Sequence, residues 1–195
     1  MDDPLVLHDL RPSRADAMKN RELLLETASR LFAARGVEAV SMSTIAEEAG
    51  VGKGTLYRHF SNKNELCLAL LDHEQRDLQE KTLARLRGNR DCSDNLKWFL
   101  AAAADFIWRA LPLMLNGTAE SGLPSLAHPA HIWFRQTIRG LLAQMSLQVD
   151  LDYAADTLYV MLDAHVIAFQ QQTHGAELPS IVAGLHALVD SLTRS

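Results

Sequence analysis

The sequence predicts an all-α protein. Aromatic residues make up only 6% of its 195 residues, Gly and Pro are sparse, and no stretch alternates apolar and polar residues long enough for a half-buried strand. Several segments instead carry apolar residues three and four positions apart, the spacing of one helix face. Hydrophobic residues form 48% of the chain, which is enough for a buried core.

The N-terminal region is expected to begin with a mobile arm. Residues 1–16 show no sustained periodicity, and chain ends without periodic apolar residues are usually poorly ordered. A first helix is expected over residues 17–35, because Gly36 provides a stop and apolar residues recur at helical spacing, namely Leu24, Ala28, Leu31 and Phe32.

Two short helices are expected next. Ser41 is a suitable N-cap for the first, which ends at Gly50 and carries small or apolar residues on one face: Ile45, Ala46 and Ala49. The second begins near Lys53 and runs to about Phe60, with Leu56 and Phe60 four residues apart on its inner side. With the helix before them, they predict a compact three-helix unit.

The rest of the chain is expected to be helical as well. Pro112 should break the second helix of this part, and the Gly and Pro residues around residues 116–128 predict a loop or short irregular helices. Five helices are expected, over approximately residues 62–86, 95–110, 129–149, 153–174 and 179–193.

Residues 41–60 have the features of a helix-turn-helix. This motif needs two short helices, a tight turn that usually contains Gly, and small residues where the helices touch. Ala46 and Ala49 allow close approach, Gly50 can adopt a positive φ, and Val51 can fill the space between the helices. The outer face of the second helix is then free to contact DNA.

That outer face carries candidate base contacts. Lys53 can donate to guanine O6 and N7, and Thr55 can meet a base edge or a thymine methyl group. Gly54 lets the backbone approach a groove without an intervening side chain. Arg58 adds a polar group on the same face.

Other side chains suit DNA phosphates. The phenol of Tyr57, the imidazole of His59 and the ammonium group of Lys63 can all donate to phosphate oxygens. Ser43 and Thr44 add hydroxyl groups near a helix start, where the helix dipole favours an anion. The alternative is that Tyr57 and His59 only pack the small domain.

The charge distribution gives modest support to DNA binding. The net charge is -5, but residues 11–63 hold nine Lys or Arg against six Asp or Glu. An excess this small requires a few well-placed cations and backbone amides. Arg11 and Arg14 either contact phosphates or belong to a solvated tail.

A dense set of these residues resembles the N-terminal signature of TetR-family regulators. The resemblance covers roughly residues 21–70, and its main departure is Gly52, where family members often carry a small hydroxyl residue. The matching residues are Ile45-Ala46, Ala49-Gly50-Val51, Lys53-Gly54-Thr55-Leu56-Tyr57, His59-Phe60, Lys63 and Leu66. The resemblance implies a homodimer that binds a near-palindromic DNA operator, usually as a repressor, and a C-terminal domain that binds a small effector.

The last two helices are candidates for a dimer interface. Their apolar spacing and small residues favour close helix packing, and a single short recognition helix contacts too few base pairs without a partner. An intersubunit four-helix bundle is predicted, although both helices alternatively serve only the monomer's core. The predicted interface residues are Val160, Ala164, Ala168, Ile181, Leu185, Leu188 and Leu192.

An effector pocket is expected among the apolar residues of the C-terminal part. Pockets between helices are largely apolar with a few polar groups, and all three Trp residues lie within 36 positions of one another. Each candidate is alternatively an ordinary core residue. The candidates are Trp98, Phe99, Phe106, Trp108, Met114, Trp133, Phe134, Met161 and His165.

Several other classes are disfavoured. Cys67 and Cys92 are too few for a disulfide framework, and His128 and His131 lack a third ligand at a metal-motif spacing. No phosphate loop or nucleophile elbow occurs, and neither a signal peptide nor a membrane-length apolar run is evident. We expect a cytoplasmic, non-enzymatic protein without a cofactor or metal.

The predicted organisation is an arm over residues 1–16, a DNA-binding domain over residues 17–63 and an effector-binding and dimerisation domain over residues 64–195. The leading hypothesis is a homodimeric repressor released from its operator by a small apolar effector. An architectural DNA-binding dimer without an effector is the alternative, and a helical enzyme without DNA binding is a third.

Overall fold

The structure is a computed structural model that describes residues 14–88, 91–116 and 129–193. These residues form nine α-helices and one short 3₁₀ helix without a strand among them, so the predicted all-α class is confirmed. They divide into two compact units, unit 1 (Met1–Leu66) and unit 2 (Cys67–Ser195). Helix α4 (Lys63–Leu86) begins in unit 1 and continues in unit 2.

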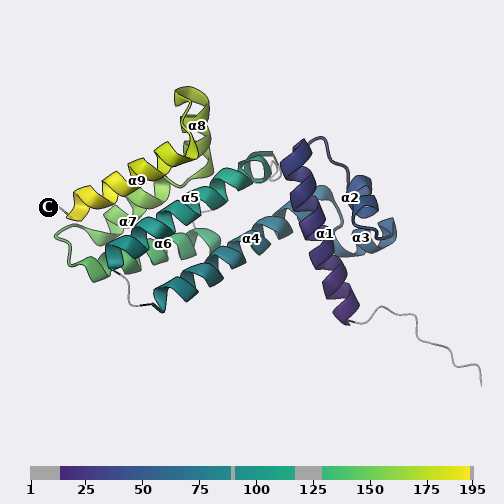
Figure 1. Ribbon diagram of the computed structural model, residues 1–195, viewed down its shortest axis with the longest axis horizontal. Helices are drawn as coiled ribbons and strands as arrows, with labels where there is room; N and C mark the ends of the chain where they lie inside the picture. Colours follow the sequence, from purple (N-terminus) through teal and green to yellow (C-terminus); the bar gives the residue numbers. More distant parts are fainter. Residues whose placement is uncertain (1–13, 89–90, 117–128, 194–195) are drawn as a thin grey trace, which may run out of the picture. The chain divides into compact units, whose positions relative to one another are not determined.

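Three helices build the described part of unit 1 (Figure 1): α1 (Arg14–Arg35), α2 (Met42–Glu48) and α3 (Lys53–His59). Gly36 ends α1 with a φ of 79°, as the sequence indicates. Helix α1 begins three residues before the predicted start at residue 17, and most of the predicted arm lies outside the described residues. The core shared by the three helices includes Leu24, Leu25, Ala28, Leu31, Ile45, Leu56 and Phe60.

Unit 2 is organised around one apolar helix, α5 (Cys92–Asn116). It packs against α6 (Pro129–Leu142), α8 (Ala164–His174) and α9 (Leu178–Thr193) (Figure 1). By length and composition α5 is also apolar enough to cross a membrane. Its Leu96, Phe99 and Leu100 are fully buried among the other helices, however, which identifies α5 as the core helix of this unit.

The prediction that Pro112 breaks this helix is wrong. Pro112 lies inside α5, which continues to Asn116. The Pro112 residue is exposed, so the interruption of the helical hydrogen bonds falls on the solvent side, where water can satisfy the free carbonyl.

The predicted single helix over residues 153–174 is instead two helices, α7 (Leu151–Val160) and α8. Asp163 caps α8, because its Oδ1 accepts hydrogen bonds from the amides of His165 at 2.8 Å and Val166 at 3.3 Å. Leu162 is buried in the turn between them. Because the segment is two helices with different buried faces, its apolar residues fall on two sides when it is treated as a single helix.

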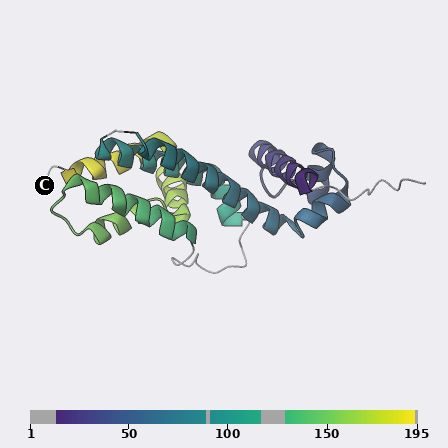
Figure 2. The same cartoon turned by 90° about the horizontal axis from the view of Figure 1, so that it is seen from below.

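The predicted helix over residues 129–149 also ends early. Helix α6 stops at Leu142, and a 3₁₀ turn leads to Ser146, which has a φ of 52°. Asp150 then caps α7, because its Oδ1 accepts hydrogen bonds from the amides of Asp152 and Tyr153 in the first turn of that helix. Helices α6 and α7 consequently lie side by side, as Figure 2 shows.

Candidate nucleic-acid interface

The turn between α2 and α3 has the geometry that the sequence predicts. Gly50 adopts a φ of 66°, and its amide donates to the carbonyl of Glu47 at 3.0 Å. The amide of Val51 donates to the carbonyl of Ala46 at 3.0 Å, which folds the chain back over α2. Ala46 is almost fully buried, so a larger residue there would separate the packed helices. These features form a helix-turn-helix.

Helix α2 is capped by Ser41. The amide of Thr44 donates to Ser41 Oγ at 3.1 Å, and the hydroxyl groups of the two residues are 2.8 Å apart. When Ser41 donates in that second bond, the hydrogen of the Thr44 hydroxyl stays available to a phosphate oxygen. Ser43 and Thr44 are both half-buried in the first turn of α2.

Helix α3 has one buried and one exposed face. Leu56 is fully buried, whereas Lys53, Gly54 and Arg58 are exposed. Tyr57 is a large aromatic residue with 50% of its surface exposed, which favours DNA contact over a packing role for this side chain. Four of the predicted contacts of α3 are thus exposed, whereas Thr55 and His59 are half-buried.

Two of the candidate base contacts are linked. Arg58 Nη2 donates to Thr55 Oγ1 at 3.1 Å, one turn earlier on α3. This bond aligns the guanidinium group along the helix while leaving its other N–H groups to bind a base edge or a phosphate.

Gly54 faces open space. A Cβ atom built there meets no other heavy atom within 4 Å, so nothing in the described protein requires a glycine. Close approach to a ligand is one reason for a glycine in an exposed helix.

Replacement of Gly54 by Ala is expected to act in opposite directions on stability and binding. Because Ala is the better helix former, unit 1 should gain about 0.5–1 kcal/mol in free energy of unfolding. The added methyl group should weaken DNA binding severalfold if the backbone approaches a groove. Thermal unfolding and fluorescence anisotropy measure the two effects, and unchanged or tighter DNA binding would contradict a close approach at Gly54.

Lys63 lies at the start of α4. Its Nζ donates to the carbonyl of Glu38 at 3.5 Å and lies 5.9 Å from the ring centroid of Phe32. An ammonium group has three hydrogens, so Lys63 retains donors for a phosphate oxygen while being held near the protein surface.

His59 is the half-buried last residue of α3. Partial burial lowers its pKa below the usual value, and the positive charges of Arg21 and Arg58 lower it further. The neutral imidazole is thereby favoured in the free protein.

Arg21 is a further residue beside the motif that is not among the contacts predicted from the sequence. Its guanidinium carbon lies 5.2 Å from the ring centroid of Phe60, at the end of α3. Arg21 belongs to α1, so no spacing within the helix-turn-helix relates it to His59, and only the tertiary fold brings them together.

The predicted effector residues of unit 2 divide into a buried aromatic cluster and less buried side chains. Phe99, Phe106 and Phe134 are buried, and the ring centroid of Phe134 lies 6.0 Å from that of Phe99 and 6.2 Å from that of Phe106. Trp133 joins this cluster, its ring centroid 5.4 Å from that of Phe99. Trp98, Trp108, Met114 and Met161 are half-buried, and His165 is exposed.

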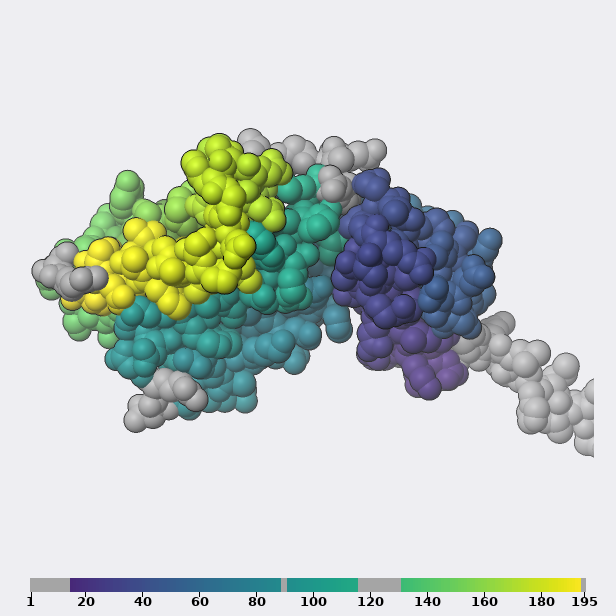
Figure 3. All heavy atoms as spheres, turned by 45° about the horizontal axis from the view of Figure 1, so that its top comes forward, coloured from purple at the N-terminus to yellow at the C-terminus, as the bar shows by residue number. Residues whose placement is uncertain are grey.

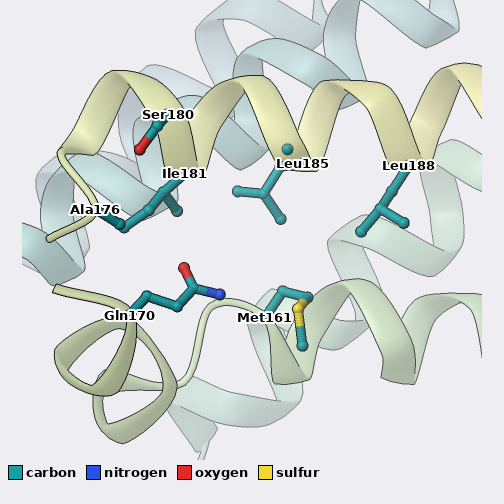
Figure 4. A pocket seen from close by; sticks show the side chains of 8 residues that line it. Met161, Gln170, Ala176, Ser180, Ile181, Leu185 and Leu188 are labelled. Carbon is teal, nitrogen blue, oxygen red and sulfur yellow. The ribbon is translucent and has the colours of Figure 1, made fainter. Parts of the chain in front are cut away.

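A pocket of about 330 Å³ lies between α8 and α9 instead. Its lining includes only one of the predicted effector residues, Met161, which faces the side chains of α9 together with Gln170 (Figure 4). The pocket opens to solvent, since Ser180 and Gly184 are exposed. The lining residues are Met161, Gln170, Ala176, Ser180, Ile181, Gly184, Leu185 and Leu188.

The predicted dimer residues divide into two groups. Val160 and Leu188 expose 48% and 38% of their surface. Ala168, Ile181 and Leu185 are buried within the chain itself, and Ala164 and Leu192 are half-buried. Helices α8 and α9 are both visible on the face shown in Figure 3, and we call their exposed apolar and small residues the α8–α9 surface: Phe169, Ala183, Gly184, Ala187 and Leu188.

His131, a residue considered for metal binding, lies against Tyr159. Its Nδ1 is hydrogen-bonded to the Tyr159 hydroxyl, and the ring centroids are 5.8 Å apart. His128 lies outside the described residues.

The N-terminal part of the chain is similar to known bacterial regulators. The model of the tetR family of bacterial regulatory proteins matches residues 24–70. Over 65 residues, covering 33% of this chain and 34% of the relative, the chain is 51% identical to an HTH-type transcriptional regulator from Staphylococcus aureus. It thus spans about a third of the length of the curated relatives it matches.

Solved structures extend the similarity to the whole fold. A TetR-family transcriptional regulator from Streptomyces coelicolor is 28% identical, with a TM-score of 0.64 over 90% of this chain and 97% of that one. The transcriptional regulator FadR from Bacillus subtilis, solved in complex with stearoyl-CoA, has a TM-score of 0.63 at 15% identity, over 86% of this chain and 96% of that one. These neighbours share an N-terminal helix-turn-helix domain followed by a helical domain.

Proposed function

Since this chain belongs to the TetR family of bacterial regulatory proteins, we propose that it is a homodimeric repressor that a small apolar effector releases from a near-palindromic DNA operator. The outer face of α3 is the observation that carries the proposal. It combines an exposed Lys53, an exposed Gly54 and an exposed Tyr57 beside a glycine-centred turn. DNA binding is assigned to residues 17–63, with base contacts from Lys53, Thr55 and Arg58.

The phosphate contacts are proposed to come from both ends of the motif. Ser43 and Thr44 lie at the start of α2, and Tyr57, His59 and Lys63 lie on α3 and at the start of α4. Together these groups supply hydroxyl, imidazole and ammonium donors, which position a protein on the duplex without specifying sequence.

Dimerisation is proposed to use the α8–α9 surface within residues 64–195. Leu188 and Phe169 are exposed apolar residues, while Ala183, Gly184 and Ala187 are small enough for helices of a second copy to approach closely. A two-fold axis through this surface presents two copies of α3 to DNA, which matches the symmetry of a near-palindromic operator.

Effector binding is also proposed for residues 64–195. The complex of FadR from Bacillus subtilis with stearoyl-CoA is a precedent for an acyl ligand in this fold. The effector weakens DNA binding only if it binds better to the DNA-free state, and DNA must then weaken effector binding by the same factor. The protein is proposed to act in the cytoplasm, where it meets chromosomal DNA.

The alternative is an architectural DNA-binding dimer without an effector. The contacts of Phe134 with Phe99 and Phe106 favour it, because these buried rings occupy part of the interior of unit 2 with the protein's own side chains. The pocket beside α9 opens to solvent and adjoins the proposed dimer surface, so a second copy is as suitable an occupant as a ligand.

Footprinting on the DNA that flanks the protein's own gene tests the proposal. We expect protection of one near-palindromic site, weaker protection as salt is raised, and loss of protection with a member of an apolar ligand panel. A protected site that no ligand affects would favour the architectural alternative, and failure to protect any site would overturn both.

Replacement of Lys53 by Ala is expected to relax base preference. A bidentate contact to guanine is worth about 1–3 kcal/mol of discrimination, so the variant should bind the operator and its single-base variants more equally. The matched control is Lys63→Ala, which should weaken binding to all sequences by a similar factor. Anisotropy titrations of both variants measure these affinities. An equal loss of affinity for every sequence in Lys53→Ala would refute the role of Lys53 in base recognition.

A further inference from the structure

Arg21 and His59 both lie beside the Phe60 ring at the C-terminal end of α3. Arg58 and His59 are the last two residues of α3, and Arg21 reaches the Phe60 ring from α1. The rings of His59 and Phe60 have centroids 6.3 Å apart, and the guanidinium carbon of Arg21 lies 5.2 Å from the Phe60 ring. Phe60 is only 1% exposed, so its ring is a fixed platform for both groups.

The charged groups around His59 come from α1, α3 and the start of α4. Arg21 and Arg58 both lower the pKa of His59. Arg21 also interacts electrostatically with Glu65, whose carboxylate accepts a hydrogen bond from the Ser61 amide at 2.7 Å. This bond, reinforced by Arg21, lowers the pKa of Glu65, so its carboxylate is ionised at neutral pH and the two guanidinium groups outweigh it.

A phosphate is a chemically suitable ligand for the side chains of Arg21 and His59. Guanidinium and imidazolium groups donate strong, charge-assisted hydrogen bonds to phosphate oxygens. Without an anion, a proton on His59 is disfavoured by its two cationic neighbours. An anion bound beside His59 opposes that effect and favours the protonated imidazole.

We propose that Arg21 and His59 form a phosphate site for the DNA backbone, and that docking of a phosphate there is accompanied by uptake of one proton on His59. The inference rests on the proposed DNA-binding function and adds to it a contact residue from α1 and a pH dependence.

The direction of the pH dependence follows from proton linkage. His59 binds a proton more tightly in the complex than in the free protein, so DNA affinity rises as the pH falls. The gain in DNA affinity is complete at pH values below the pKa of His59 in the free protein. It is absent at pH values above the pKa of His59 in the complex. Between them, affinity changes by at most about tenfold per pH unit.

The pH test uses a random-sequence 30-base-pair duplex at low, constant ionic strength, because a phosphate site does not require the operator. Anisotropy titrations at pH 6, 7 and 8 should show wild-type affinity rising toward low pH, and His59→Gln should remove most of that rise. The control variant His73→Gln removes a histidine from unit 2 instead, and it should retain the rise in affinity toward low pH. Between residues 14 and 66, His59 is the only histidine.

Arg21 is tested against Arg30, which lies on the same helix and pairs with Glu48 at 3.3 Å. Each replacement by Gln removes one positive charge from α1. Arg21→Gln should weaken duplex binding roughly tenfold and reduce the dependence of log K on log salt by about one phosphate contact, while Arg30→Gln should do neither. Equal effects of the two variants would overturn the role of Arg21.

A direct measurement separates this inference from the proposed function. The NMR signal of the His59 Cε1–H group reports its pKa, which should rise when the duplex is added. If the protein binds the duplex but the pKa of His59 is unchanged, the inference fails while DNA binding stands. If no duplex binds at any pH, both fail.

Discussion

A glutamate in place of Leu188 is expected to convert the proposed dimer into a folded monomer. Leu188 exposes 38% of its surface in the single chain, so the charge is tolerated there. In the proposed interface the same carboxylate would be buried without a partner, at a cost of about 3–5 kcal/mol. Two-fold symmetry places two such charges in one interface, so the dimer Kd should rise by at least about a thousandfold.

Sedimentation analysis of Leu188→Glu measures this shift, with Leu83→Glu as the matched control. Leu83 is an exposed leucine on α4, 57% accessible and outside the α8–α9 surface. The control should stay dimeric with unchanged unfolding, and the monomeric variant should lose affinity for the two-fold operator. A dimeric Leu188→Glu protein would contradict the proposed interface.

Replacement of Leu56 by Ala is expected to remove DNA binding by unfolding unit 1. Leu56 is fully buried on the inner face of α3, and loss of such a side chain costs about 2–5 kcal/mol. A unit of about 50 described residues has a small core, so this is a large share of its stability. Hydrogen exchange should show lost protection in α1 to α3 while the helices of unit 2 stay protected.

The control for this change is the next residue. Tyr57→Ala removes a larger side chain, but one that is half exposed, so it should alter the free energy of unfolding far less. It should weaken DNA binding across sequences through the lost phosphate contact. Strong destabilisation by Tyr57→Ala with little effect of Leu56→Ala would mean that the faces of α3 are assigned the wrong way round.

The sequence predicted the DNA-binding motif well because its determinants are local. Ser41 caps α2 three residues before the amide it binds, and Gly50 adopts the positive φ that its position in the turn requires. The division of α3 into inner and outer faces follows from the spacing of Leu56 and Phe60 alone. Each of these features depends on fewer than ten neighbouring residues.

The errors in unit 2 came from tertiary context. Pro112 is accommodated in α5 because it faces solvent, and no local pattern specifies which side of a helix will be exposed when most residues are apolar. Asp163 is a recognisable N-cap in hindsight, but the apolar residues on both sides of it continue the helical pattern through the turn.

Composition also does not distinguish a core from a cavity. Phe99 and Phe134 satisfy the sequence criteria for an apolar pocket, yet in the structure their rings contact each other. The pocket beside α9 depends on Gln170 and Ser180, which carry no pattern of their own. Arg21 was missed for the same reason, because its relation to His59 arises only when α1 packs against α3.

Hydroxyl-radical footprinting of the wild-type protein on its operator tests the central claim most directly. If paired copies of the α2–α3 motif bind DNA, two symmetric protected patches should appear, separated by about 10 base pairs or a multiple of that length. The Leu188→Glu variant should lose both patches together. Protection of a single patch, or of no specific site by the wild-type dimer, would contradict the account.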